Sequence, residues 1–403
     1  MRKRFQVNRE VMSTTEKKQD KGALILSSGD TSLGIVRSLG RHDIRLYLVD
    51  DKRSPAYASR YVKHRFRLGG ETEAERVGYL IDLAEKNNLK EWAIFPDGDR
   101  WAAFLARNKQ TLDMYFKMTT PSWDILKWSI DKRLTYQLAA EAGVHYPLTY
   151  YPEDRVDVEK INGSFPMILK PAHHERQDPF SGVRAWQVNS KAELLSFYDR
   201  ATALTDTSNI LIQEMIPGGV NSQFSYAALC KDGKVLADAF VERKRLRPPD
   251  FGAGVYVETI IKPEIEMPAK QWLAKNSYTG LVEIDFKYDS RDGRYKLLDV
   301  NARPWAWIAL CASAGVDFPF LMWKMLQGEE IKFARARPHI RWVRTIYDLS
   351  SSVYSIRKGE LSIKKYFASL KGVKHETFAL DDPWPALAEL FLLLNRGLRK
   401  IFI

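Results

Sequence analysis

Residues 280–303 read GLVEIDFKYDSRDGRYKLLDVNAR and form the most informative segment of the chain. Apolar and polar side chains alternate on either side of Asp292-Gly293, and this period of two predicts two β-strands joined by a tight turn. The apolar side chains then share one face of the hairpin, and they are Val282, Ile284, Phe286, Leu298 and Val300. The oxygen-bearing side chains share the other face, and they are Glu283, Asp285, Asp299 and Asn301.

This polar face predicts a metal site. A hairpin centred on Asp292 sets Asp285 directly across from Asp299, with the two Cβ atoms ~5 Å apart. Two carboxylates at that separation repel each other unless a cation lies between them, and hard oxygen ligands of this type suit magnesium that carries nucleotide phosphates. Glu283 faces the same way and is the alternative to Asp285 as a ligand. The simpler alternative is an exposed hairpin with solvated acids.

The composition is that of a globular protein with two or three domains. The chain has 403 residues, of which 45% are hydrophobic and 28% are charged. Its two cysteines, Cys230 and Cys311, are too few for a disulfide framework and lack the spacing of metal ligands, which favours a reducing, cytoplasmic location. The first 21 residues are polar and basic, lack the apolar core of a signal peptide and are expected to form a disordered extension. No run reaches the ~18 to 20 apolar residues of a membrane span.

The net charge of +12 raises the question of an anionic partner. The basic residues are scattered, and no zinc finger, helix-turn-helix or RNA-binding motif accompanies them, so we expect no nucleic-acid partner. An anionic substrate or a membrane surface explains the charge as well. Basic residues cluster most visibly in residues 242–247 and again near the C-terminus, at Arg396, Arg399 and Lys400.

Residues 22–121 predict a small parallel-sheet domain of the Rossmann type. An apolar strand at 23–26 leads through the glycine turn 27–34 into a helix and then into a second strand at 44–50, which makes a βαβ unit. A further strand at 92–95 ends at the polar sequence PDGD. The glycine turn lacks the full spacing of a dinucleotide-binding motif, so dinucleotide binding is only a weak alternative here.

Beyond Pro121 the sequence predicts two helices and then a series of strands. Two helices are expected near residues 124–129 and 131–142, the second ending at Gly143. Strands are then expected at residues 165–171, 210–216, 222–229, 235–241 and 255–260, and a helix near 268–278 precedes the hairpin.

The last segment, residues 384–403, is apolar with a basic end. A helix of this kind can lie on an anionic membrane. A helix packed on the protein's own core uses the same apolar face and is the commoner explanation. The sequence leaves both open.

Five short motifs occur in one order along the chain, and together they resemble the ATP-grasp superfamily. They are Asp131-Lys132, Ile168-Leu169-Lys170, residues 213–218 (QEMIPG), Asp285, and residues 299–303 (DVNAR). The resemblance spans roughly residues 22–325 and is closest to the carboxylate-amine ligase branch, with likeness to D-aspartate ligases and carbamoyl-phosphate-synthase-like proteins. Arg243-Lys244 and residues 248–252 (PPDFG) add a similarity specific to that branch.

The resemblance implies an α/β, ATP-grasp fold, in which two α+β lobes grip ATP next to an N-terminal parallel-sheet domain. The domain boundaries that it implies are residues 1–21 for the extension, 22–121 for the N-terminal domain, 122–212 for the small lobe, 213–330 for the large lobe with the metal site, and 331–403 for a helical C-terminal extension.

The nucleotide-binding residues are assigned by the same resemblance. Lys132 and Lys170 contact the phosphates of ATP as mobile point charges. The backbone of Glu214, Met215 and Ile216 lies between the lobes and faces the adenine edge. Where an acidic residue commonly holds the ribose hydroxyls, this chain has Asn221, whose amide can still hydrogen-bond a diol.

The metal and catalytic residues follow in the same way. Asp285, Asp299 and Asn301 match the magnesium ligands, with Asp299 bridging two ions and manganese as the alternative metal. Aspartate at position 299, where glutamate is usual, shortens the reach by one methylene. Arg303 and Arg243 are expected to act as catalytic residues that neutralise the transferred phosphoryl group and the acyl phosphate.

The function implied is ATP-dependent ligation through an acyl phosphate, with a small-molecule carboxylate and an amine as substrates. Asp97 or Asp99 is expected to contact the amine, and Trp305 with Trp307 forms either an aromatic wall near it or part of the core. Carboxylation and carbamoyl phosphate formation are alternatives within the superfamily. A non-catalytic nucleotide-binding module in envelope or polysaccharide assembly, peripheral to the inner face of the membrane, is an alternative of another class. A homodimer and a membrane contact through residues 384–403 are further expectations.

Overall fold

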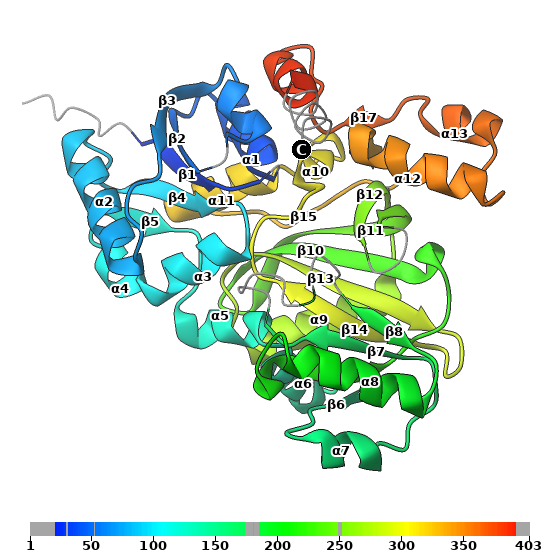
Figure 1. Cartoon of the computed structure of the whole chain (residues 1–403). Coiled ribbons are helices and arrows are strands. Elements are labelled where there is room, and N and C mark those ends of the chain that lie inside the picture. The colour runs from blue at the N-terminus through cyan, green and yellow to red at the C-terminus, as the bar shows by residue number, and fades with distance from the viewer. Residues whose placement is uncertain are drawn as a thin grey trace, which may run out of the picture.

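The computed structural model describes residues 21–391, except residues 30, 52, 174–179, 181–184 and 249–251 (Figure 1). Three β-sheets with their helices make up the described chain, and the predicted α/β class is confirmed. All but the last residue of the predicted N-terminal extension, and residues 392–403 of the predicted C-terminal helix, lie outside the described residues.

The N-terminal domain is built on five parallel strands, which are β1 (Ala23–Ser27), β2 (Leu46–Asp50), β3 (Val62–Arg67), β4 (Trp92–Pro96) and β5 (Phe116–Met118). Their order in the sheet is β3-β2-β1-β4-β5. The helices of the domain are α1 (Thr31–Arg41), α2 (Glu73–Lys86), α3 (Asp99–Arg107) and α4 (Lys109–Leu112). Helix α1 packs on one face, and α2 and α3 pack on the other. Because both faces are covered, β1 and β4 are buried throughout and their apolar runs could be recognised in the sequence.

Two strands of this sheet were missed by the sequence prediction. The edge strand β3 carries exposed basic side chains, and β5 has three residues. Neither gives the apolar run or the alternation on which strand prediction depends.

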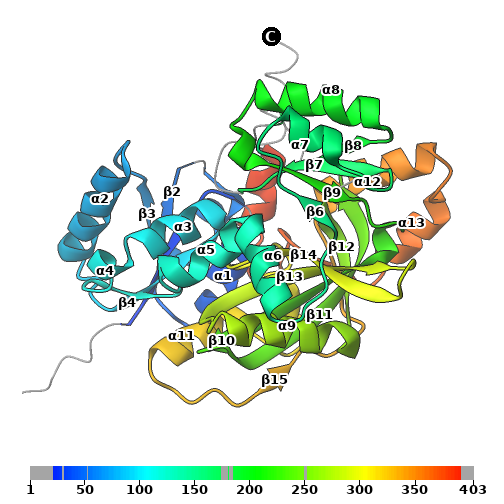
Figure 2. The same cartoon turned by 90° about the horizontal axis from the view of Figure 1, so that it is seen from below.

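The small lobe is a four-stranded antiparallel sheet in the order β6-β9-β7-β8. Its strands are β6 (Thr149–Tyr150), β7 (Met167–Pro171), β8 (Trp186–Val188) and β9 (Ile210–Glu214). Helices α7 (Arg155–Lys160) and α8 (Lys191–Thr202) lie on its outer face (Figure 2). The side chains between this sheet and α8 form a core of their own, which includes Leu169, Leu194, Tyr198 and Ile212.

The large lobe is an eight-stranded sheet. Its strands are β10 (Gln223–Lys231), β11 (Lys234–Arg247), β12 (Ala253–Ile260), β13 (Gly280–Asp289), β14 (Arg294–Asn301), β15 (Ala334–Arg335), β16 (Arg341–Val343) and β17 (Lys374–His375). The main order is β14-β13-β10-β11-β12-β16-β17, and β15 pairs with β11. Helices α5 (Trp123–Ile130), α6 (Lys132–Glu141) and α9 (Pro263–Lys275) pack on one face, which confirms the two helices predicted after Pro121.

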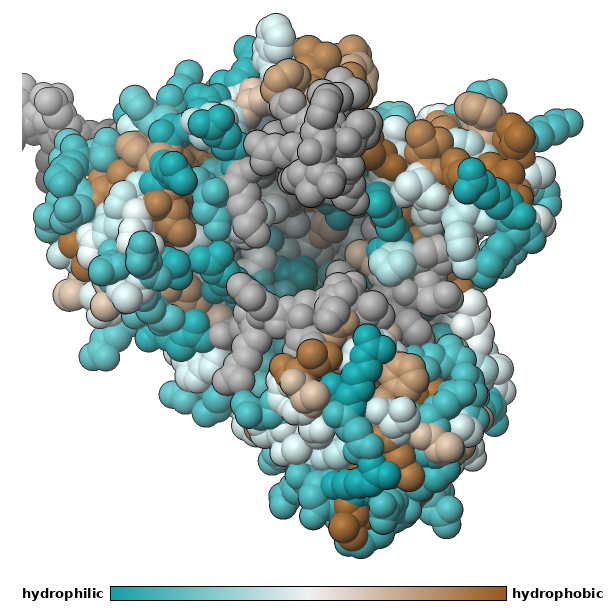
Figure 3. Space-filling model, viewed as in Figure 1, coloured by the Kyte–Doolittle hydropathy of each residue, from teal (hydrophilic) through white to brown (hydrophobic). Residues whose placement is uncertain are grey.

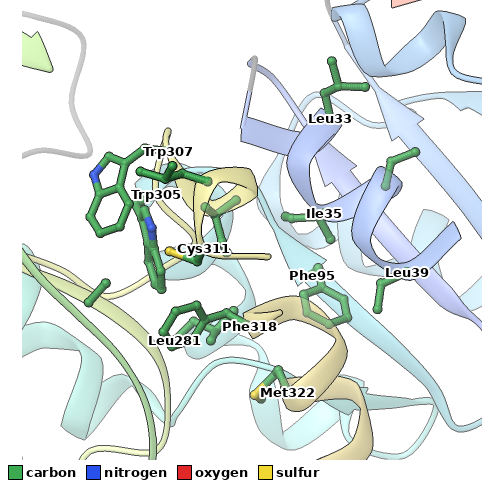
Figure 4. Close-up of a cluster of buried hydrophobic side chains, with 14 of the residues drawn as sticks. Leu33, Ile35, Leu39, Phe95, Leu281, Trp305, Trp307, Cys311, Phe318 and Met322 are labelled. Carbon is green, nitrogen blue, oxygen red and sulfur yellow. The ribbon is translucent and has the colours of Figure 1, made fainter. Parts of the chain in front are cut away.

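The other face of the large sheet shares one core with the N-terminal domain. Helices α10 (Ile308–Ser313) and α11 (Phe318–Leu326) lie between the sheet and α1. Figure 4 shows this cluster, in which Leu33 and Leu39 of α1 lie across from Trp305, Phe318 and Met322. Domain and lobe are therefore joined by continuous apolar packing, whereas the small lobe is not part of this cluster.

The C-terminal region contains helices α12 (Thr345–Arg357) and α13 (Ile363–Ser369), and β16 and β17 extend the large sheet at its β12 edge. After β17 the chain returns to the N-terminal domain. There the buried Arg37 forms an ion pair with Asp382 at 3.0 Å and also donates to the carbonyl oxygens of Glu376 and Thr377. The C-terminal region thus bridges the large lobe and the N-terminal domain.

None of the described helices has the length and apolar character needed to cross a membrane. Cys230 and Cys311 are buried free thiols.

Candidate active site

The β13–β14 hairpin has the register that the sequence predicts. Asp285 pairs with Asp299, and Glu283 pairs with Asn301. Gly293 in the turn has a φ of 71°, a left-handed conformation that glycine adopts without strain. One detail of the prediction is wrong. A bulge after Asp285 pairs Phe286 with Leu297, so Leu297 and not Leu298 joins the core.

Asp299 meets a lysine from a different element. Lys132, the first residue of α6, donates to the Asp299 carboxylate at 2.6 Å. The Lys132 side chain is 5% exposed and that of Asp299 is 22% exposed, so the ion pair lies at the edge of the core with its carboxylate partly open. The Lys132 N–H also donates to the carbonyl oxygen of Ala172, which ties α6 to the end of β7.

Asp285 meets an arginine and a serine. Arg243 on β11 donates to Asp285 at 2.5 Å, and Ser225 on β10 donates to the same carboxylate oxygen at 2.7 Å. Burial alone would lower the pKa of Arg243, but the attraction of Asp285 and Glu283 outweighs it and raises that pKa. The guanidinium therefore stays charged beside the hairpin.

Glu283 is held by an indole and an amide. Its carboxylate accepts from the indole of Trp307 at 2.7 Å and from the amide of Asn301 at 3.4 Å. Burial and the nearby Asp285 raise the pKa of Glu283 to about 7, although Arg243 counteracts them. The register, which places Asp285 and not Glu283 opposite Asp299, favours Asp285 as the predicted ligand.

Arg303 joins the hairpin to the N-terminal domain. Its guanidinium donates to both oxygens of Asp99, at 3.1 and 3.3 Å, and to the Asn301 side-chain oxygen at 2.9 Å. Asp99 begins α3, directly after β4. The predicted amine contact and the predicted phosphoryl contact are therefore brought together from positions 204 residues apart.

Lys170 lies on β7 and approaches from the small lobe. Its ammonium donates to the Tyr136 hydroxyl at 3.1 Å, and that hydroxyl donates to the Leu298 carbonyl oxygen at 2.8 Å. Burial lowers the pKa of Lys170 to about 8, although Asp299 raises it. The two predicted phosphate lysines thus converge on the hairpin from separate elements, α6 and β7.

The predicted adenine strand is tied to the hairpin by ion pairs. The Glu214 carboxylate accepts from Lys296 at 2.9 Å and from Arg291 at 2.6 Å, and the Glu214 N–H donates to Leu148 at 2.9 Å. Lys287 donates to the Ile216 carbonyl oxygen at 2.8 Å. The Glu214 N–H and the Ile216 carbonyl oxygen thus already have protein partners, although a carbonyl oxygen can accept a second hydrogen bond.

Met215 and Asn221 complete the predicted nucleotide-binding residues. The Met215 N–H donates to the carbonyl oxygen of Pro166 at 3.2 Å. Asn221 is exposed in a short 3-10 turn before β10.

The glycine turn of the N-terminal domain is filled by a carboxylate of the protein. Asp97 accepts from the N–H groups of Ser28 and Gly29, both at 2.8 Å. Burial raises the pKa of Asp97 to about 6 in spite of these bonds. Because those N–H groups already hold a carboxylate, the turn offers less to a dinucleotide phosphate.

Figure 3 shows a hollow near the centre of the face seen in Figure 1, with hydrophilic residues on its floor.

Trp305 and Trp307 are 0% and 3% exposed and belong to the core shared with the N-terminal domain, which rules out an exposed aromatic wall. Trp307 nevertheless positions Glu283.

The donor set of the hairpin fits magnesium. Within the described residues, no group of three or more His, Cys, Asp or Glu side chains could hold a metal ion by itself. Two opposed aspartates and an amide oxygen are a small set of hard ligands, which suits an ion that keeps several water and phosphate oxygens. The register that brings Asp285 and Asp299 together supports such a site.

Ser225 and Tyr136 were not recognised in the sequence, and Asp99 was predicted to contact an amine and not to hold Arg303. Ser225 contacts Asp285 from another strand, and no local pattern identifies it. Tyr136 did carry a signal, because it lies four residues after Lys132 on α6 and so shares its helix face.

Comparisons with known proteins agree with this architecture. Residues 206–346 match the family described as ATP-grasp in the biosynthetic pathway with Ter operon. The chain is 24% identical over 303 residues to the D-aspartate ligase of Enterococcus faecium, a match that covers 70% of each chain.

Solved structures show the same fold. The biotin carboxylase domain of Hydrogenobacter thermophilus 2-oxoglutarate carboxylase, solved with MgADP and bicarbonate, matches with a TM-score of 0.64 at 14% identity, over 80% of this chain and 74% of that one. The L-amino acid ligase of Bacillus licheniformis matches with a TM-score of 0.59 at 16% identity, over 77% of this chain and 75% of that one. With its order of motifs, its lobes and its relatives in agreement, the chain belongs to the ATP-grasp superfamily.

Proposed function

We propose that this protein is an ATP-dependent carboxylate-amine ligase. In the first step, a carboxylate oxygen of one substrate attacks the γ-phosphorus of ATP, and the bond from that phosphorus to ADP breaks. In the second step, an amine nitrogen attacks the carbonyl carbon of the acyl phosphate. The carbon–oxygen bond to phosphate then breaks, which releases the amide, phosphate and a proton.

The observation that carries the proposal is that two carboxylates of the hairpin form ion pairs with two basic side chains, and that both kinds of group can exchange these partners for a bound magnesium nucleotide. Lys132 now neutralises Asp299, and Arg243 now neutralises Asp285. Bound magnesium nucleotide would supply a cation for Asp285 and Asp299, and phosphates for Lys132 and Arg243. The same four side chains therefore stay compensated when it binds, which avoids leaving buried charges unpaired.

In this proposal Asp285, Asp299 and Asn301 hold magnesium, with manganese as a substitute. The ion would supply charge neutralisation at the phosphate oxygens. Lys132 on α6 and Lys170 on β7 would bind the phosphates. Arg243 and Arg303 then act on the transferred group.

Arg303 suits that role because its guanidinium group is already fixed by both oxygens of Asp99, whereas Arg243 would exchange Asp285 for a phosphate. Fixed donors stabilise charge that develops in a transition state without having to reorganise.

The hinge between the lobes is proposed to hold the base and the ribose. The backbone of Glu214, Met215 and Ile216 lies where β9 leaves the small lobe, and Asn221 follows on the way to β10. The ion pairs of Glu214 with Arg291 and Lys296 would keep this segment against the hairpin.

A ligase is favoured over a carboxylase for two reasons. The relative found by sequence is a D-aspartate ligase, whereas the match to a carboxylase at 14% identity speaks only to the fold. The Arg303–Asp99 pair also links the phosphoryl site to the N-terminal domain, whose Asp97 and Asp99 are the proposed contacts for an amine. The buried free thiols suit the cytoplasmic location predicted from the sequence.

The test is a matrix of acids and amines, with ADP release as the readout and hydroxylamine added to trap acyl phosphate as hydroxamate. We expect ADP release that requires one acid and hydroxamate from that acid when the amine is left out. The Asp299→Asn protein is the matched control for contaminating ATPases.

Two results would overturn the proposal. ADP release that needs bicarbonate and no organic acid would identify a carboxylation or carbamoyl phosphate reaction. Tight binding of magnesium ATP without turnover on any pair would favour a non-catalytic module.

A further inference from the structure

The C-terminal region carries an exposed basic surface that is separate from the candidate active site. Between positions 357 and 374 one acidic residue, Glu360, accompanies six basic residues, which are Arg357, Lys358, Lys364, Lys365, Lys371 and Lys374. All seven side chains are exposed. In the part of the chain that the structure describes, Lys364 and Lys365 form no ion pair with an acidic side chain. The charges of Lys364 and Lys365 are therefore available to attract an external anion.

Large apolar side chains are exposed within the same surface. Ile363 and Phe367 of α13 are 61% and 66% exposed, and their spacing of four residues puts them on one face of the helix. Leu349 and Tyr354 of α12 are 52% and 40% exposed. Figure 3 shows hydrophobic side chains gathered over α12 and α13, with hydrophilic ones around them.

The inner face of helix α13 is packed against the rest of the protein, so the exposure of Phe367 does not result from poor packing of the helix. Tyr366 points inward and is 6% exposed, and the Arg245 guanidinium lies 5.4 Å from its ring centre. The Tyr256 hydroxyl donates to the Ser369 carbonyl oxygen at 2.8 Å, and the Ser362 side chain caps the start of the helix. The inner face is fixed by these contacts, while the outer face meets solvent.

We propose that the surface formed by α12 and α13 binds an anionic lipid bilayer, with Ile363 and Phe367 entering the headgroup region and the surrounding lysines contacting acidic lipids. Protruding apolar side chains flanked by lysines are the arrangement that inserts into such an interface. The long lysine stems also reach lipid phosphates while their apolar neighbours insert. A nucleic acid would satisfy the charge but would leave Ile363 and Phe367 in water.

A second exposed apolar group lies on the same side of the molecule. Leu380, Trp384 and Leu387 are 89%, 59% and 56% exposed, and the segment that carries them, drawn in red in Figure 1, lies in the upper part of that view, as α12 and α13 do. The sequence predicted membrane contact through residues 384–403, of which 392–403 lie outside the described residues. The proposal for α12 and α13 rests on different residues and does not depend on the ligase activity.

The test is sedimentation of the full-length protein with vesicles of phosphatidylcholine alone or mixed with phosphatidylglycerol. We expect binding only to the anionic vesicles, decreasing with salt. The Lys364→Glu/Lys365→Glu protein should partition at least about tenfold less, since each basic residue near an anionic surface adds attraction. The Phe367→Ser protein should also bind less, and its deficit should persist at every salt concentration because it lacks an apolar contact.

Matched controls separate this surface from a general effect of charge or hydrophobicity. Lys231→Glu/Lys234→Glu makes the same charge change at the exposed turn between β10 and β11, and Met267→Ser removes an apolar side chain that is 61% exposed on α9. Both controls should bind like the unchanged protein. Thermal unfolding and ADP release should be the same in all variants.

Three results would overturn the proposal. The first is no binding to anionic vesicles, or equal binding to neutral ones. The second is binding that survives all the α13 changes and disappears when residues 392–403 are removed, which would assign the contact to that segment. The third is an α13 variant that changes the oligomeric state measured by light scattering while vesicles do not bind, which would identify a protein interface.

Discussion

Replacement of Asp299 by asparagine tests the central feature of the candidate site. Asn keeps the size of the side chain and one acceptor oxygen, so Lys132 can keep its hydrogen bond and loses only its ionic partner. If the carboxylate holds the metal as proposed, turnover should fall by at least ~10²-fold, or about 2.7 kcal/mol in the activation free energy.

The protein should remain folded. Breaking a fully buried ion pair costs about 3–5 kcal/mol. The variant keeps an acceptor for Lys132, whose side chain is 5% exposed, so the loss in free energy of unfolding should lie between that of one hydrogen bond, about 1 kcal/mol, and the lower end of that range. A protein of this size should then lose only a few degrees in Tm.

The assay is ADP release with the best acid and amine pair, together with a thermal unfolding curve. Asp292→Asn is the control, since Asp292 lies in the turn of the same hairpin and is 37% exposed, with Lys296 3.4 Å away. That control should keep both activity and stability. Near-normal ADP production by the folded Asp299→Asn protein would refute the metal assignment.

Three other perturbations test the charges around the site and the domain contact. Lys132→Ala should weaken the binding of a non-hydrolysable ATP analogue with magnesium by at least about tenfold, because a phosphate contact is lost; unchanged affinity in calorimetry would remove Lys132 from the phosphate site. The pKa of Lys170, lowered to about 8 by burial, means that the nucleotide-free protein loses this charge as the pH rises through that value. Affinity for the analogue should therefore decline between about pH 8 and pH 10, while Lys170→Arg, which stays charged, should show no such decline; parallel curves would contradict the assignment. Arg37→Ala should lower the free energy of unfolding in urea by about 3–5 kcal/mol because Asp382 is left buried without its ionic partner, whereas Arg41→Ala, in a half-exposed pair, should cost about 0–1 kcal/mol; equal losses would contradict the importance of burial.

The β13–β14 hairpin was predictable because residues within it determine both its polar face and its turn. Alternation set the polar face, and Asp292-Gly293 set the turn, so the pairing of Asp285 with Asp299 followed from two rules. The bulge at Leu298 was not predictable in this way, since Leu297 and Leu298 are the same residue type and only packing selects between them.

The remaining partners depend on tertiary structure. Nothing near Arg303 in the sequence indicates that Asp99 will hold it, and nothing near Glu283 indicates that Trp307 will donate to it. The C-terminal strands β16 and β17 have three and two residues, which is too short for any periodic signal.

The core shared by the N-terminal domain and the large lobe bears on the order in which substrates bind. Apolar packing around Trp305 and the Arg37–Asp382 ion pair join these two parts, so neither can rotate without breaking buried contacts. The small lobe has a separate core, and within the described chain it is the part whose movement over the nucleotide disturbs that packing least. An acceptor pocket between the N-terminal domain and the large lobe would then keep its shape whether or not nucleotide is present. We therefore expect the amine to bind the nucleotide-free protein about as well as the nucleotide complex, which corresponds to a random rather than an obligatory kinetic sequence.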